Sequence, residues 1–197
     1  MRVCAFSHLP PTPSFPPSSG SGDWGLARQG AIFVTDADRV LIANSTFTRL
    51  DGNAVFLSGR TRNVSVVRNH FSFLGESAVA SWGFANGVDA TAGLQPWGTT
   101  VEENICREIG HYEKQVSCYF AAVTAGATIE RNIMFNMPRA AVNYNDDMAG
   151  GSLLTRNLIW NTCRESQDHG PCEALRAPAR CLRNRDGDNP PHPTRTP

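Results

Sequence analysis

The sequence predicts an all-β domain in which parallel strands wind into a coil, and three observations lead to this prediction. A short phrase recurs along the chain, a second apolar run follows it at a fixed offset, and no stretch shows the apolar spacing of an amphipathic helix. The phrase is clearest in GTTVEENICREIG (98–110), GATIERNIMFNMP (126–138) and GGSLLTRNLIWNT (150–162).

The phrase aligns on one polar position, which recurs at intervals of 24, 35, 28 and 25 residues. The residues at this position are Ser45, Asn69, Asn104, Asn132 and Asn157. The aliphatic residues three positions earlier are Ile42, Val66, Val101, Ile129 and Leu154. The apolar residues two positions later are Phe47, Phe71, Cys106, Met134 and Ile159. Each unit therefore repeats the same short strands around the same corner.

One such unit is too small to bury its apolar face, whereas stacked units bury a continuous column. Successive coils would lie about 4.8 Å apart, the spacing of neighbouring strands in a sheet. The amides would form a ladder along one corner and satisfy backbone groups that the bend leaves unpaired. The leucine-rich repeat also places Asn after spaced aliphatic residues, but here Val, Ile, Phe and Ala stand at most of the positions where it requires Leu.

A second strand is expected after each phrase, in NAVFLSG (53–59), SAVASWG (77–83), SCYFAAV (117–123) and AAVNYND (141–147). If Val79 and Val142 point into the coil, strand alternation places Ala80, Trp82, Asn143 and Asn145 on the outer face. An aromatic ring beside amides is a typical platform for a sugar, because the ring stacks on a pyranose and the amides bind its hydroxyls.

These units, with their pattern V-x-x-N-x-F followed by G-x-x-A-V, resemble the right-handed parallel β-helix proteins of the pectin-lyase-like superfamily. The segments GTTVEENICREIGHYEKQVSCYF and NTCRESQDHGP are similar to a subgroup described as right-handed β-helix domain proteins. The resemblance covers residues 30–170, about five coils. It implies a right-handed parallel β-helix and an extracellular enzyme or binding protein that acts on polysaccharide or oligosaccharide.

Composition limits the domain and its partners. Proline-rich segments at both ends predict a disordered tail over 1–27, a β-helix domain over 28–170 and a second disordered tail over 171–197. The 18 basic residues equal the 18 acidic residues, so nothing points to nucleic acid, and no apolar run is long enough to span a membrane. The six cysteines show no metal-binding spacing. The first residues lack the apolar core of a signal peptide, and the abrupt end of the resemblance predicts a fragment whose site is incomplete.

Longer intervals between units indicate loops at 83–98 and 111–115. Residues from successive coils should line the edge that carries the second loop, including the carboxylates of Glu76 and Glu113. We expect the acid and base roles to fall to Glu113 and Asp168. The other candidate catalytic residues are His111, Lys114, Glu165 and His169, and the candidate substrate-binding residues are Trp82, Arg139, Asn143, Asn145 and Asp146.

Three functions stay open at this point. Two carboxylates suit a glycoside hydrolase, whereas a polysaccharide lyase needs a base beside a uronate and often Ca²⁺, and no other cofactor is expected. A non-catalytic polysaccharide-binding or structural coil is the alternative. The third is a leucine-rich-repeat interaction protein, which would contain substantial helix.

Overall fold

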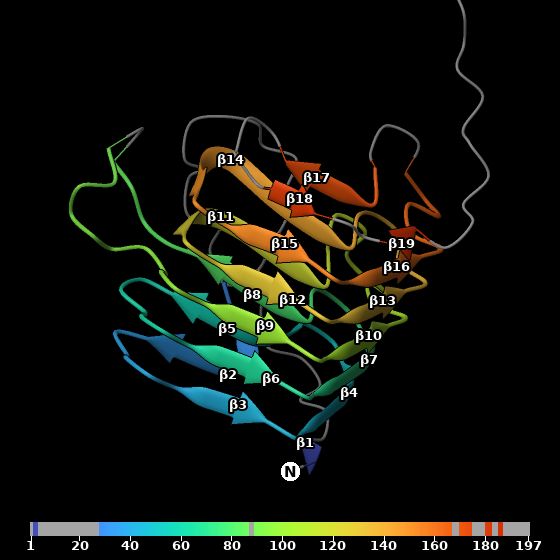
Figure 1. The fold of residues 1–197 in the computed structure, drawn as a ribbon. Helices are drawn as coiled ribbons and strands as arrows, with labels where there is room; N and C mark the ends of the chain where they lie inside the picture. Colours follow the sequence, from blue (N-terminus) through green and yellow to red (C-terminus); the bar gives the residue numbers. More distant parts are fainter. Residues whose placement is uncertain are drawn as a thin grey trace, which may run out of the picture.

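A computed structural model of the chain confirms the all-β parallel solenoid of about five coils (Figure 1). The structure describes residues 2–3, 28–86, 89–166, 170–174, 180–182 and 185–186. Within these ranges there is no helix, and hence none that could cross a membrane. Since a leucine-rich-repeat protein was expected to contain helix, the strand-only described part weighs against that alternative.

Each coil contributes one strand to each of three parallel sheets, which the chain visits in the order B, C, A. Sheet A contains β1 (Arg2–Val3), β4 (Thr46–Leu50), β7 (His70–Leu74), β10 (Ile105–Arg107), β13 (Ile133–Phe135), β16 (Leu158–Trp160) and β19 (Arg185–Asp186). Sheet B contains β2 (Gly30–Thr35), β5 (Asn53–Ser58), β8 (Val79–Trp82), β11 (Tyr119–Ala125), β14 (Val142–Gly150) and β17 (Cys172–Ala174). Sheet C contains β3 (Leu41–Ala43), β6 (Ser65–Val67), β9 (Thr100–Glu102), β12 (Thr128–Glu130), β15 (Leu153–Thr155) and β18 (Arg180–Leu182).

The predicted apolar columns run through the core in register. On sheet C, Ile42, Val66, Val101, Ile129 and Leu154 pair in one file, and all are buried. On sheet A, Phe47, Phe71, Cys106, Met134 and Ile159 form the equivalent file, in which the two phenylalanine rings stack 5.0 Å apart. Because a shift of register by one residue would turn every one of these side chains outward, the buried files fix the pairing.

The predicted amide ladder is also present, at the corner between sheets C and A. The side-chain oxygen of Asn69 accepts from Ser45 N at 3.0 Å, and that of Asn104 accepts from Asn69 N at 2.8 Å. The side-chain oxygen of Asn132 accepts from Asn104 N and that of Asn157 accepts from Asn132 N, both at 2.9 Å. Each asparagine also donates to a backbone carbonyl inside the coil, so the ladder satisfies buried groups at the bend.

Each coil turns three corners, and a residue with positive φ stands at each of them. The residues before the ladder are Asn44, Arg68, Glu103, Arg131 and Arg156, with φ between 52° and 57°. The residues at or just after the end of the sheet A strands are Arg49, Phe73, Glu108, Asn136 and Asn161. The residues before the sheet C strands are Arg39, Asn63, Gly98, Gly126 and Gly151. Non-glycine residues adopt this conformation at a cost, so the stacking of the coils must offset it at most corners.

The two predicted loops lie at different corners. Residues 83–98, outside the gap at 87–88, leave β8 toward sheet C and project from the coil as the green loop of Figure 1. Residues 111–115 lie between β10 and β11, at the corner between sheets A and B. This second corner, from the end of each sheet A strand to the start of the next sheet B strand, is called the A–B corner below.

Candidate functional site

The A–B corner brings together most of the predicted site residues that the structure describes. The loop 111–115 folds over the preceding coil, where Leu74 O accepts from His111 N at 3.0 Å. Gly75 O accepts from Tyr112 N and Glu113 N at 3.1 and 3.0 Å. A Cβ atom on Gly75 would lie 1.8 Å from Asp51 O, so only glycine permits this close passage. The glycine therefore seats Glu113 directly above the strand turn that carries Glu76.

Glu76 and Glu113 form an interacting carboxylate pair. Burial, together with the charge of Glu113, raises the pKa of Glu76 from 4.5 to about 8, although a hydrogen bond from Asn53 opposes the shift. Asn53 Nδ2 donates to Glu76 Oε2 at 2.5 Å. At neutral pH Glu76 is therefore protonated and can donate its proton, which is the state required of a general acid.

Asn53 also orders the backbone at the start of sheet B. Its Nδ2 donates to Gln29 O at 3.0 Å, and its Oδ1 accepts from Ser77 N at 3.1 Å. On the next coil, Ser77 Oγ accepts from Ser117 N at 3.2 Å. These contacts make a second, shorter polar ladder that holds the backbone beside Glu76.

A chain of hydrogen bonds extends from the carboxylate pair to the following coil. Glu113 Oε1 accepts from Gln115 N at 3.1 Å, and Gln115 Oε1 accepts from Arg139 Nη1 at 2.8 Å. Arg139 is only 8% exposed, so its guanidinium is held in place rather than moving freely in solvent. The predicted binding residue Arg139 thus lies in the same network as Glu113.

The other residues of the corner lie toward solvent. Lys114 Nζ and Glu165 Oε1 form an ion pair at 3.1 Å, with side chains 48% and 52% exposed. An exposed pair of this kind contributes about 0–1 kcal/mol to stability. His111 is exposed and stacks on Phe73 with ring centroids 6.0 Å apart, while the Arg107 guanidinium lies 5.0 Å from the same ring.

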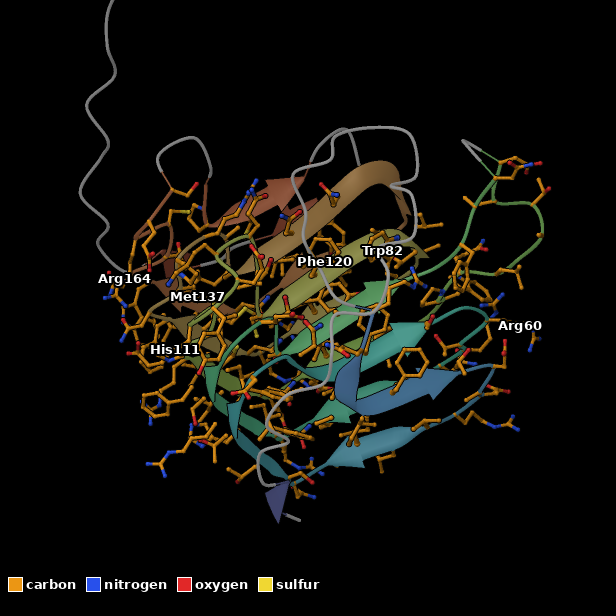
Figure 2. The ribbon with its side chains drawn as sticks, turned by 180° about the vertical axis from the view of Figure 1, so that it is seen from behind. Arg60, Trp82, His111, Phe120, Met137 and Arg164 are labelled. Carbon is orange, nitrogen blue, oxygen red and sulfur yellow. The ribbon has the colours of Figure 1, made fainter. Side chains whose placement is uncertain are left out.

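Trp82 lies away from this corner. Figure 2 shows Trp82 beside Phe120 over the strands in the middle of the view, whereas His111 and Arg164 lie toward the left edge of the molecule. The rings of Trp82 and Phe120 meet edge to face at 6.5 Å. The predicted outward residues Asn143 and Asn145 follow on β14, but they are buried, with exposed fractions of 0% and 2%. The predicted platform is therefore not open to solvent at its amides.

The side chains of three further candidates, Asp146, Asp168 and His169, are not described by the structure. The backbone of Asp146 lies within β14 at an irregularity in the pairing with β11, where Ala122 pairs with Asn145 but Thr124 pairs with Ala149. Its side chain is not described. Asp168 and His169 lie outside the described residues.

The sequence predicts Glu76 as one of several candidate carboxylates, whereas the acid and base roles are expected at Glu113 and Asp168. The signal that could have selected Glu76 was its place in the column, directly before a buried strand and beside the loop that carries Glu113. The role of Asn53 was missed as well, although it stands at the start of a strand where the next units have serine.

No group of three or more His, Cys, Asp or Glu side chains close enough to hold a metal ion occurs among the described residues. Comparisons with known protein families, with curated proteins and with solved structures found no match to this chain.

Proposed function

We propose that the chain is a carbohydrate-active β-helix domain of the glycoside hydrolase type, related to the pectin-lyase-like superfamily, and that Glu76 and Glu113 are its acid and base. The observation that carries the proposal is the fold of the loop 111–115 over Gly75, whose carbonyl accepts from Glu113 N at 3.0 Å and so brings Glu113 beside Glu76. One member of this carboxylate pair keeps its proton at neutral pH because burial and the other member's charge raise its pKa to about 8. Hydrolysis of a glycosidic bond requires two carboxyl groups with this division of labour.

In the proposed reaction, Glu76 donates its proton to the glycosidic oxygen as the bond from that oxygen to the anomeric carbon breaks. The Glu113 carboxylate supports the positive charge that develops on the sugar, either by attacking the anomeric carbon or by removing a proton from the attacking water. Asn53, which donates to Glu76 Oε2, orients the acid. Arg139, anchored through Gln115, supplies hydrogen-bond donors on the neighbouring coil.

The protonation of Glu76 favours hydrolysis over β-elimination. A lyase begins by removing a proton from carbon, which requires an unprotonated base. Glu76 is a proton donor below about pH 8, so it suits protonation of a leaving group. The lyase alternative would place the base on another residue of the corner, such as Lys114 or His111.

The test is release of reducing ends from a panel of pectic, xylan-type and chitin-type polysaccharides. Glu76→Gln and Glu113→Gln should each lower turnover about 10²-fold or more, since a positioned acid or base contributes about 10²–10⁴-fold. Glu103→Gln is the matched control, because Glu103 lies at another corner, where it pairs with Arg68 and Arg131. Turnover that survives both corner substitutions would refute the assignment, and product absorbing as an unsaturated uronide would favour the lyase.

A non-catalytic binding module is the second candidate, and a separate feature of sheet A favours it. Phe135 and Trp160 stack on its outer side, with ring centroids 4.3 Å apart and planes 7° from parallel. Beside them Asn161 Nδ2 donates to Asn136 Oδ1, and Asn136 Nδ2 donates to Glu108 Oε1, both at 2.5 Å. Aromatic rings beside aligned amides are suited to sugar binding without chemistry.

Affinity electrophoresis on the same polysaccharides separates the two candidates. For a binding module we expect retardation without product release, and loss of retardation in Trp160→Ala. Retention that is unchanged in Trp160→Ala would exclude the sheet A rings as the binding surface.

A further inference from the structure

A guanidinium group covers the face of Trp82. Arg28 lies two residues before the first strand of sheet B. Its Cζ atom lies 4.1 Å from the ring centroid of Phe84 and 4.9 Å from that of Trp82. It lies 5.6 Å from the ring centroid of Phe56. These three rings, called the aromatic box below, come from β5, from β8 and from the segment that follows β8. Such positions over ring faces are those of a cation–π contact.

Groups beside the aromatic box also accept hydrogen bonds from the guanidinium. Arg28 Nη2 donates to Ser58 Oγ at 2.9 Å and to Trp82 O at 2.8 Å, and Nη1 approaches Gly83 O at 3.4 Å. All three acceptors are neutral, and no carboxylate forms an ion pair with Arg28 within the part of the chain that the structure describes. A planar cation with several donors fits this arrangement better than the ammonium of lysine.

The three groups that accept hydrogen bonds from Arg28 are held in place by the packing around them. A Cβ atom on Gly83 would lie 2.5 Å from Val123 O and 2.6 Å from Gln95 Cα, so the backbone at this point is tightly enclosed. Ser58 pairs with Trp82 across β5 and β8, and the Ser58 hydroxyl and the Trp82 carbonyl accept from the same nitrogen of Arg28. Phe56 is fully buried, and Trp82 is braced by Phe120. Preorganised groups of this kind bind a ligand at little cost in ordering.

We propose that the aromatic box is a guanidinium-binding site, and that its ligand is an arginine side chain, supplied in this structure by Arg28 of the same chain. Burial of the guanidinium, which lowers its pKa to about 10, still leaves it charged at neutral pH. As long as Arg28 is bound, it blocks the Trp82 face, so a sugar cannot stack there. The proposal is independent of the carboxylate pair and does not need catalysis.

The experiment removes the internal ligand and offers a soluble one. In Arg28→Ala, N-acetyl-arginine amide should bind and quench tryptophan fluorescence with a saturating curve at millimolar concentrations. N-acetyl-lysine amide should bind at least about threefold more weakly, since it lacks the planar fork. The unaltered chain should bind the arginine amide about tenfold or more weakly, because Arg28 already fills the box.

Two control variants give each outcome a meaning. Arg39→Ala removes an arginine that is 83% exposed and pairs loosely with Asp38, so it should behave like the unaltered chain. Arg28→Ala combined with Trp82→Leu should lose the binding gained in Arg28→Ala. Equal binding in this double variant, or no binding in a folded Arg28→Ala, would overturn the proposal.

If Arg28→Ala does not fold, the test uses Arg28→Lys instead, because this variant keeps the positive charge. In that variant the arginine amide should raise the melting temperature more than the lysine amide does. An equal effect of the two amides would contradict a guanidinium site.

Discussion

Asn104 occupies the middle of the buried amide ladder, and its replacement by alanine is the sharpest test of the fold. Asn104 is 1% exposed, and its Oδ1 accepts from Asn69 N at 2.8 Å and from Asn69 Nδ2 at 3.1 Å. Its Nδ2 donates to Val66 O at 2.8 Å and to Asn132 Oδ1 at 3.0 Å. Alanine therefore removes four hydrogen bonds and leaves the Asn69 N–H and the Val66 carbonyl in the core without these partners.

Each buried polar group that loses its partner costs about 1–3 kcal/mol. Two such backbone groups predict a loss of about 2–6 kcal/mol in the free energy of unfolding, since the Asn69 amide keeps its hydrogen bond to Ile42 O. That is a large part of the stability of an ordinary domain. The loss should appear in urea unfolding followed by circular dichroism as a lower midpoint with an unchanged slope.

Ser45→Ala provides the matched control, because Ser45 ends the same ladder. Its hydroxyl makes one hydrogen bond, to Ala43 O at 3.0 Å, and its backbone N–H keeps Asn69 as acceptor. We expect a loss of about 0.5–1.5 kcal/mol. Equal destabilisation by Asn104→Ala and Ser45→Ala would show that the ladder does not satisfy the buried polar groups of this corner.

Three other outcomes are expected. The folded chain holds the Glu76 proton up to about pH 8, whereas the unfolded chain releases it near pH 4.5. The contribution of the protonated Glu76 to the free energy of unfolding is therefore complete below pH 4.5 and is lost as the pH rises to about 8. The slope is at most about 1.4 kcal/mol per pH unit, and a slope unchanged in Glu76→Gln would contradict the shifted pKa. Gly75→Ala should cost about 3 kcal/mol or more in thermal or urea unfolding, since its methyl would lie 1.8 Å from Asp51 O; a wild-type midpoint would show that the corner relaxes freely. The buried thiol of Cys106, whose pKa is raised by burial and by Cys118, should resist iodoacetamide until the chain is unfolded, and rapid alkylation of the native chain would count against a closed core.

Most of the coil could be predicted because its cause is local and repeated. Val66, Val101 and Ile129 stand at the same distance before an asparagine, and parallel stacking in register is the arrangement that buries all of them at once. The number of sheets could not be predicted in this way. The phrase around Asn104 contains a strand of sheet C and a strand of sheet A, and only the positive φ of Glu103 separates them.

The candidate site was predictable in part. The loop 111–115 and Arg139 were expected at one edge because insertions in a solenoid emerge at its corners. The pairing of Glu76 with Glu113 was not expected, since it depends on how the loop folds back over Gly75. Contacts between coils at this corner join residues 24 or more positions apart in the sequence, as Arg139 and Gln115 are, and the spacing does not tell which side chains of an inserted loop meet there.

The partner of the Trp82 ring could not be predicted from the sequence either. Strand alternation indicated its outward position, yet the ring meets Arg28, from 54 residues earlier in the chain. The sequence by itself determined the repeat, the buried files and the amide corner, because these follow from periodic spacing and the need to bury apolar surface. Only the tertiary structure decided which carboxyl keeps its proton and which cation covers the aromatic ring, because burial and charge at a point in space are set by segments that the sequence does not place side by side.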